Sequence, residues 1–400
     1  MNETVQHNSE RAAGAITTAA FTTMFVYSLV VSLPSILIND VVETFSLEGT
    51  DEGLMGALTS FGFMLSIFFV VMVQGRAKKT TVLVIALAAQ AIAVFACGFS
   101  PVFLLFCTAC VFVGFSGGFL DTFNNSVIVD VRESESTKYL GYLHGLFGVG
   151  SLLSPLIFML ILRNTDWRGV HYVLAVASAL VMLFVFIITR KTGSTRNKAA
   201  AREHLFTKSD LLAYMKIKRN ITLAMAGFFA MLTIAGVMVW IVRYMTLRYD
   251  AAEIGALSIT VYWICATVNR FLLAPIIKRA PVKFFVLGAF FSGISLLIGV
   301  VSGSSVVFCV CIGIFGLCSG HFIPVLVSES AVGYDGRTTF TTSVIMFLMS
   351  LARIAAPIMM AFLSTQISLT IGMMLPITTA IAAMICGLFA IKSRKIVLDV

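Results

Sequence analysis

Apolar runs of bilayer length recur along almost the entire chain, and this pattern limits what the chain can fold into. A helix needs about 20 consecutive, mostly apolar residues to cross the hydrocarbon core of a membrane. Twelve segments meet this requirement and predict an all-α membrane protein with twelve transmembrane helices. The predicted spans are 13–38, 53–74, 80–99, 101–129, 138–162, 169–190, 220–246, 253–277, 283–302, 304–328, 339–364 and 369–391.

The composition supports a membrane protein and excludes several other classes. Of the 400 residues, 59% are hydrophobic and 12% are charged, whereas charged residues make up about 25% of soluble domains. Too few charged residues remain to cover a soluble core. The composition therefore excludes a soluble enzyme, a disordered chain and a nucleic-acid-binding protein. The net charge of +9 is explained by basic loops on one side of the membrane rather than by binding to nucleic acid.

The basic residues predict the orientation of the chain. Most of the 28 Lys and Arg residues fall in loops on the side of the N-terminus, with a dense group between Arg190 and Arg219. Cytoplasmic loops of membrane proteins carry such an excess. We therefore expect both termini to be cytoplasmic, in a multi-pass protein of the cell's inner or plasma membrane. The first span is too long for a signal peptide, so we expect it to be retained.

No pattern of reactive or metal-ligating residues emerges. All eight cysteines lie inside apolar runs, which is typical of small core residues. There is no phosphate-binding glycine loop and no spacing of His and Cys typical of a metal site. We expect neither an enzyme, a metal site nor a cofactor. The cysteines are Cys97, Cys107, Cys110, Cys265, Cys309, Cys311, Cys318 and Cys386.

The two halves of the chain resemble each other. MGALTS at 55–60 corresponds to IGALSI at 254–259, and GFSGGF at 114–119 corresponds to GLCSGH at 316–321. The offset of the second pair also carries Pro155 onto Pro357. Parallel six-helix repeats are the architecture of one large class of transporters. The sequence thus predicts two pseudo-symmetric six-helix bundles, 1–190 and 220–400, joined by a hydrophilic cytoplasmic linker at 191–219.

Four stretches carry a resemblance to a known family. They are GFSGGFLDTFNN (114–125), YLGYLHGLFGVGSLLSP (139–155), YWICATVNR (262–270) and GLCSGHFIP (316–324). These stretches are similar to the fourth-, fifth-, eighth- and tenth-helix patterns of the fucose–galactose–glucose proton symporter branch of the major facilitator superfamily. The resemblance implies the major facilitator fold, alternating access and proton-coupled transport. Sugar-transporting members of this branch have an acidic residue near the position of Val30, which is apolar in this chain. The solute therefore stays open between a sugar and a small organic anion.

Asp121 and His144 are the candidates for proton coupling. Placing an ionisable side chain at the depth of the bilayer core costs at least about 2.5–3.5 kcal/mol of free energy. Such a residue is therefore expected to have a polar partner or a function. The resemblance places Asp121 at the acidic fourth-helix position associated with proton coupling. His144 enters the next span at a comparable depth and is a candidate relay or partner. The alternatives are a structural hydrogen bond and a sodium site.

Further polar residues within the spans are candidate solute contacts. Asn124 and Asn125 share the helix face of Asp121 because they follow it by three and four residues. They either bind solute or hydrogen-bond to another helix. Arg353 and His321 are the other candidates, and the alternative for Arg353 is a buried ion pair.

Glycines and prolines indicate where spans pack closely and bend. Gly148 and Gly150 supply small surfaces for helix contact, and Pro155 and Pro357 are expected to kink their spans. Arg270, near one end of its span, is assigned a structural or gating role.

We predict a secondary active transporter that couples proton symport to uptake of a small polar solute. The main alternative is a proton-driven exporter of amphipathic compounds, for which 34 Phe and 19 Met would supply an adaptable apolar cavity. A non-transporting membrane sensor is a remote alternative. The expected partners are the solute and the lipid bilayer, the expected state is a monomer, and the driving force is a proton gradient, with sodium left open.

Overall fold

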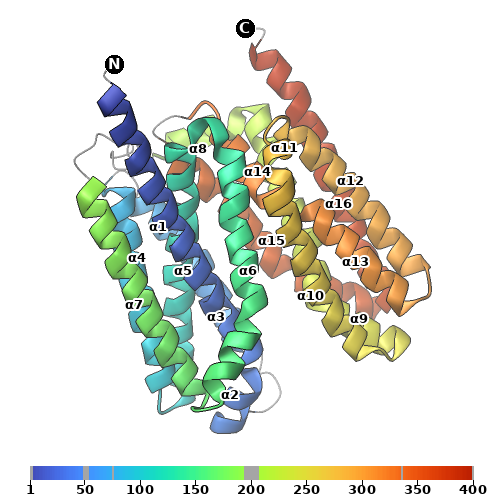
Figure 1. The fold of residues 1–400 in the computed structure, drawn as a ribbon. Coiled ribbons are helices and arrows are strands. Elements are labelled where there is room, and N and C mark those ends of the chain that lie inside the picture. Colours follow the sequence, from blue (N-terminus) through green and yellow to red (C-terminus); the bar gives the residue numbers. More distant parts are fainter. Residues whose placement is uncertain (1–2, 48–53, 74–75, 193–206, 335–336, 399–400) are drawn as a thin grey trace. The chain divides into compact units, whose positions relative to one another are not determined.

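The described part of the chain is helical and folds as a multi-pass membrane protein. The computed structural model describes residues 3–47, 54–73, 76–192, 207–334 and 337–398 (Figure 1). Eleven described helices are long and apolar enough to cross a membrane. The predicted second span corresponds to α3 (Leu54–Val73), whose apolar part Leu58–Val70 is shorter. The prediction of an all-α membrane fold is confirmed.

The described residues of the first half of the chain form six long α-helices and one short one. The short helix, α2 (Ile38–Phe45), follows the first span. The long helices are α1 (Glu3–Ile36), α3, α4 (Lys79–Phe99), α5 (Phe103–Val131), α6 (Ser136–Leu162) and α7 (Trp167–Thr192).

The second half begins after the predicted linker, of which residues 193–206 lie outside the described residues. A short helix, α8 (Lys208–Lys216), starts with a capping box in which Thr207 and Asp210 bond each other's backbone N–H groups. The spans that follow are α9 (Lys218–Tyr249), α10 (Ala252–Val268) with α11 (Ala274–Ile277), α12 (Pro281–Val301), α13 (Ser305–Ser319) with α14 (Phe322–Ser330), α15 (Thr338–Gln366) and α16 (Leu369–Leu398).

The chain divides into two compact units, and each packs by the same scheme. Unit 1 contains 1–134, 149–206 and 334–343, and unit 2 contains 135–148, 207–333 and 344–400. In unit 1, α5 packs on α3 and α4, and α7 packs on α4 and α1. In unit 2, α13 packs on α10 and α12, and α16 packs on α12 and α9. The corresponding spans therefore pair in the same way, which agrees with the internal repeat in the sequence.

Two spans of unit 2 are interrupted, and the sequence analysis expected neither interruption. Between α10 and α11 the chain forms a π-helical turn at Asn269–Leu273. A turn at Gly320 and His321 separates α13 from α14. Each interruption releases backbone groups from regular helical pairing, so side chains must satisfy them.

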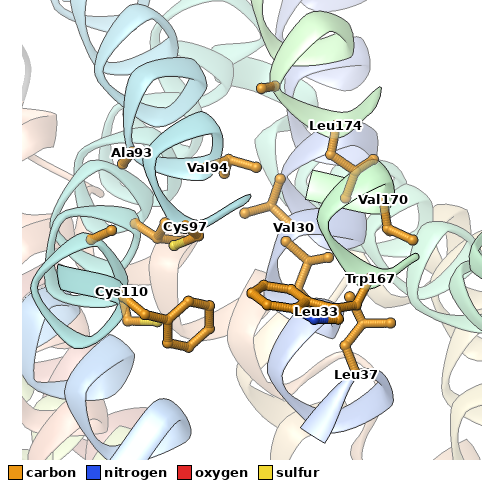
Figure 2. Packing of buried hydrophobic residues seen from close by; sticks show 14 of the residues in the cluster. Val30, Leu33, Leu37, Ala93, Val94, Cys97, Cys110, Trp167, Val170 and Leu174 are labelled. Carbon is orange, nitrogen blue, oxygen red and sulfur yellow. The ribbon is translucent and has the colours of Figure 1, made fainter. Parts of the chain in front are cut away.

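Each unit has its own apolar core. Figure 2 shows the core of unit 1, where residues of α1, α4, α5 and α7 pack together. Cys97 and Cys110 belong to this core, as predicted, and are buried. The indole Nε1 of Trp167 donates to Thr44 Oγ1 at 2.8 Å, which satisfies the polar atom of this buried ring.

Glycines on α5 let neighbouring helices approach to backbone contact. A Cβ atom added at Gly114 would overlap the carbonyl oxygen of Thr59 on α3, and one added at Gly118 would overlap Ser66 Oγ. Unit 2 has the same close approach at a glycine, because a Cβ added at Gly316 would lie 2.5 Å from the carbonyl oxygen of Tyr262. The matched motifs GFSGGF and GLCSGH thus have a packing role in both units.

Gly114→Ala is expected to destabilise the protein, because its new methyl group has no room against the backbone of α3. Overpacking of this kind costs about 1–3 kcal/mol, which should lower the midpoint of thermal unfolding in detergent by several degrees. Gly293→Ala is the matched control, since a Cβ there has its nearest neighbour at 3.6 Å. Its midpoint should stay or rise, because alanine favours helix. Equal losses for both variants would contradict the close-approach account.

Candidate functional site

The second half of α5 carries a polar face inside unit 1. Asn125 Nδ2 donates to the carboxylate of Asp121 at 2.9 Å and to the Asp121 carbonyl oxygen at 2.8 Å. Asp121 is half-buried, and Asn125 is fully buried. The helical spacing predicted this shared face, and the structure brings these two residues together.

Asn124 and its neighbour Thr122 are buried without hydrogen-bond partners. Neither Oδ1 nor Nδ2 of Asn124 has a partner among the described residues, although the side chain is 0% exposed. The hydroxyl of Thr122 is unpaired as well. A buried polar group without a partner costs about 1–3 kcal/mol, so a bound solute or water that satisfied this carboxamide would recover free energy.

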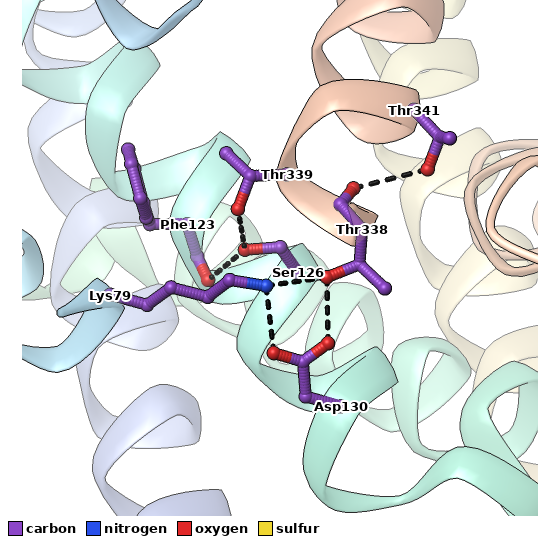
Figure 3. A network of polar contacts seen from close by, with 7 residues as sticks. All are labelled: Lys79, Phe123, Ser126, Asp130, Thr338, Thr339 and Thr341. Atoms are coloured by element: carbon purple, nitrogen blue, oxygen red, sulfur yellow. Dashed lines mark hydrogen bonds and ion pairs between the residues drawn. The ribbon is translucent and has the colours of Figure 1, made fainter. Parts of the chain in front are cut away.

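A charged network closes one end of unit 1 (Figure 3). We call the end of each span that borders the Lys- and Arg-rich loops its basic end. There, Lys79 at the start of α4 forms an ion pair of 2.7 Å with Asp130 near the end of α5. Thr338, which starts α15, accepts a hydrogen bond from Lys79 and donates one of 2.6 Å to Asp130. The side chains of Lys79 and Asp130 are only 3% and 8% exposed.

A second set of hydrogen bonds in the same network joins α15 to α5. Thr339 Oγ1 donates to Ser126 Oγ at 3.2 Å, and Ser126 donates in turn to the carbonyl oxygen of Phe123 at 3.1 Å (Figure 3). The first turn of α15 therefore belongs to unit 1 through hydroxyl and carboxylate bonds.

Arg270 is the centre of a polar cluster in unit 2. It lies in the π-helical turn and is 5% exposed. Its Nε donates to the carbonyl oxygen of Gly320 at 2.8 Å, and its Nη1 donates to the carbonyl oxygen of His144 at 3.0 Å. The guanidinium therefore caps the open end of α13 and ties it to the first half of α6.

Asn269 and His321 complete this cluster. Asn269 Nδ2 lies 2.7 Å from the carbonyl oxygen of Leu317 and 3.2 Å from His321 Nδ1. His321 Nε2 lies 3.1 Å from the carbonyl oxygen of Phe284. Both ring nitrogens of His321 thus have protein partners in this conformation, and the imidazole bridges the interrupted tenth span to α12.

Ion pairs also join the basic ends of spans within unit 2. Arg219 at the start of α9 pairs with Glu329 near the end of α14 at 2.5 Å, with both side chains nearly buried. Glu135, just before α6, pairs with Lys278 after α11 at 2.5 Å. The first pair resembles that of Lys79 and Asp130 in unit 1 in one respect: each joins the end of the fourth or tenth span to the start of another span.

The other predicted residues lie on several elements. His144 is buried on α6 in unit 2, whereas Asp121 is in unit 1, so their proton relay stays a prediction. Arg353 is exposed on α15. A Cβ at Gly148 would overlap Thr267 Oγ1, and a Cβ at Gly150 would overlap Ser28 Oγ. Both α6 and α15 continue as helices through their prolines, Pro155 and Pro357.

The sequence analysis missed the ion pairs at the basic ends. Asp130 and Glu329 end the fourth and tenth spans, and Lys79 and Arg219 begin other spans. Their signal was an acidic residue just after the predicted fourth span and another just after the predicted tenth span. It went unused because acidic residues at span ends are usually solvated.

Comparison with known proteins identifies the family to which the chain belongs. Its fold and its two repeated six-span patterns define a secondary transporter. The chain belongs to the Major Facilitator Superfamily, whose family model matches residues 17–357. Among curated proteins, no sequence matches the chain significantly. The recognition of this family in the sequence is confirmed.

Solved structures share the fold at low sequence identity. The Major Facilitator Superfamily transporter FucP, in an outward conformation, is similar with a TM-score of 0.75 and 15% identity, over 94% of this chain and 98% of that chain. A variant of the E. coli fucose:proton symporter FucP gives 0.75 and 16%, with the same coverage. The human organic anion transporter TETRAN gives 0.71 and 13%, over 96% of this chain and 99% of that one.

Proposed function

We propose that this transporter couples the downhill entry of protons to the uptake of a small polar solute by alternating access. The observation that carries the proposal is the polar face of α5. There a half-buried carboxylate, Asp121, lies one turn from a buried carboxamide, Asn124, whose polar atoms are unpaired. A protonatable group beside an unsatisfied solute-binding group is what coupled transport requires.

In this proposal Asp121 takes up and releases the transported proton. Burial favours its neutral form and a nearby positive charge favours its ionised form, so a change of surroundings during transport changes its protonation. His144 serves as relay or partner. Asn124, Asn125, His321 and Arg353 are the proposed solute contacts, although His321 must first release its protein partners.

The moving parts in the proposal are the two bundles predicted at 1–190 and 220–400. Gly148 and Gly150 give α6 a surface that slides, Pro155 and Pro357 supply points of bending, and Arg270 holds the interrupted spans of unit 2 together. We propose cytoplasmic termini, a monomer and a location in the inner or plasma membrane, on the basis of the distribution of basic residues.

The two similar transporters with named solutes support two classes of solute. One structure is of a fucose:proton symporter and one is of an organic anion transporter. A sugar or a small organic anion is accordingly proposed for this chain. An exporter of amphipathic compounds remains the second candidate, because the same fold accommodates both directions of transport.

The test is concentrative uptake into proteoliposomes under an imposed pH gradient. Labelled sugars and small organic anions are offered with an acidic exterior. Accumulation of one solute above its external concentration, abolished by a protonophore, is the expected result. Efflux of a preloaded lipophilic dye, with no accumulation of any polar solute, would contradict the proposal and favour the exporter.

Asn124→Ala is expected to raise the KM for solute about tenfold with little change in kcat. The substitution removes hydrogen bonds to the solute that together contribute about 1–1.5 kcal/mol. Gln90→Leu is the matched control, since Gln90 is a buried amide in unit 1 that donates to Ser178 instead. Initial uptake rates over a range of solute concentrations separate KM from kcat. An unchanged KM in Asn124→Ala would remove Asn124 from the site.

A further inference from the structure

Arg270 holds a buried positive charge that no carboxylate of the described chain neutralises. Its guanidinium stays protonated at physiological pH. Its hydrogen-bond acceptors are the carbonyl oxygens of Gly320 and His144, which are uncharged. The open end of α13 contributes only a partial negative charge, equivalent to about half an elementary charge for a whole helix. The site therefore keeps a net positive charge in the interior of a membrane protein.

The other deeply buried cations of the described chain differ from Arg270 in this respect. Arg219 pairs with Glu329, and Lys79 pairs with Asp130. A buried charge without an opposite charge is strongly destabilising, which is why such pairs form. An arginine kept at this depth without a carboxylate indicates that its counter-charge comes from outside the chain.

The guanidinium also has an edge without a protein acceptor, and residues beside it in the chain carry unpartnered polar atoms. No described residue accepts a hydrogen bond from its Nη2. Thr267 Oγ1 and Asn269 Oδ1 are buried and unpartnered among the described residues. Thr267 lies one turn before Arg270 on the same helix face. Its hydroxyl and Arg270 Nη1 both border the position that a Cβ of Gly148 would fill.

The interruptions of the eighth and tenth spans both involve Arg270. Arg270 lies in the π-helical turn of the eighth span, and its acceptor Gly320 lies at the break of the tenth span. In transporters, solute and ion sites are typically built where spans are discontinuous. Single π-helical turns are likewise frequent at functional sites.

We propose that Arg270 binds the carboxylate group of the transported solute, with the hydroxyl of Thr267 as a further donor. This inference rests on the proposed function and narrows its solute to a small monoanionic carboxylate. A guanidinium presents parallel N–H donors that match a carboxylate. One cation balances one carboxylate, whereas a phosphate dianion would need a second cation.

Trp263 makes the binding measurable without transport. The Arg270 guanidinium carbon lies 5.7 Å from the centre of the Trp263 ring, so an anion on Arg270 changes the environment of that indole. The chain has three tryptophans, and replacing Trp167 and Trp240 by Phe leaves Trp263 as the only reporter. The purified protein is titrated with gluconate against glucose, lactate against lactamide, and glutarate against glutaramide, at constant ionic strength.

The expected result is a saturable change in Trp263 fluorescence with at least one carboxylate and none with its neutral counterpart. Arg270→Gln should abolish the change, and Arg270→Lys, which keeps the charge but loses the planar fork, should weaken the apparent affinity about tenfold. Arg243→Gln is the matched control, since Arg243 is an exposed arginine of unit 2 that has no part in the Arg270 cluster. It should leave the Trp263 titration unchanged.

Two results would overturn the inference: equal responses to a carboxylate and its neutral counterpart, or no response of Trp263 to any carboxylate. The titration of the protein with all three tryptophans, in which Arg270→Gln alone should remove the response, checks that the two replacements have not disturbed the fold. Uptake of the same compounds separates this inference from the proposed function. Proton-driven accumulation of glucose but not gluconate would leave the transporter proposal standing and remove the anion site. Binding of a carboxylate with no accumulation of any solute would support the anion site and contradict the proposed transport function.

Discussion

Asp121→Asn is expected to abolish proton-driven accumulation of solute while exchange of solute across the membrane continues. Asparagine keeps the size and polarity of the side chain, and it can still interact with Asn125. It cannot take up or release a proton, so the transport cycle loses its coupling step. Accumulation should fall to the level of protein-free vesicles, whereas exchange of internal for external labelled solute should remain near the wild-type rate.

The matched control for this experiment is Asp40→Asn, which changes an aspartate in the first turn of α2. It should leave both accumulation and exchange unchanged. Loss of exchange together with accumulation in Asp121→Asn would show a general defect in folding or solute binding. Full accumulation in this variant would exclude Asp121 as the proton site.

Asp130→Asn is expected to destabilise the protein strongly, because it removes the carboxylate that faces the nearly buried ammonium of Lys79. Removing one partner of a buried ion pair costs about 3–5 kcal/mol. The unfolding midpoint in detergent should fall by many degrees. The double variant Lys79→Met with Asp130→Leu replaces both charges by apolar groups of similar size and should recover most of the stability.

Thr338→Val supplies a graded control, because it removes hydroxyl bonds to both charges and keeps the ion pair. Its loss of stability should be smaller than that of Asp130→Asn. A double variant no more stable than Asp130→Asn would contradict the claim that an unpaired charge is the source of the loss.

The spans and the fold class could be predicted because both follow from local properties. A run such as 80–99 is apolar for the length of a bilayer, and α4 occupies Lys79–Phe99. The interruption at Gly320 and His321 was not predicted, since 304–328 is apolar enough overall to be taken as one continuous span. What stabilises that break is Arg270, which is 50 residues away in sequence and donates to the freed carbonyl oxygen.

The candidate site was predictable only along single helices. Helical spacing placed Asn125 beside Asp121, and their hydrogen bond is present. It could not reveal that Asn124 has no partner, because this depends on what surrounds α5. The bond between Asp130 and Thr338 joins residues 208 positions apart, a separation that no local pattern encodes. Arg270 was assigned a structural role from its place in the span, and its contacts agree with that role while leaving one edge of the guanidinium free.

The central claim, proton-coupled transport, is tested most directly by the pH change that a solute drives across a proteoliposome membrane. With no imposed pH gradient, adding the transported solute outside should make the external medium more alkaline, because each entering solute brings protons with it. The rate should saturate with solute concentration and vanish in Asp121→Asn. Solute entry with no accompanying change in external pH would contradict the account.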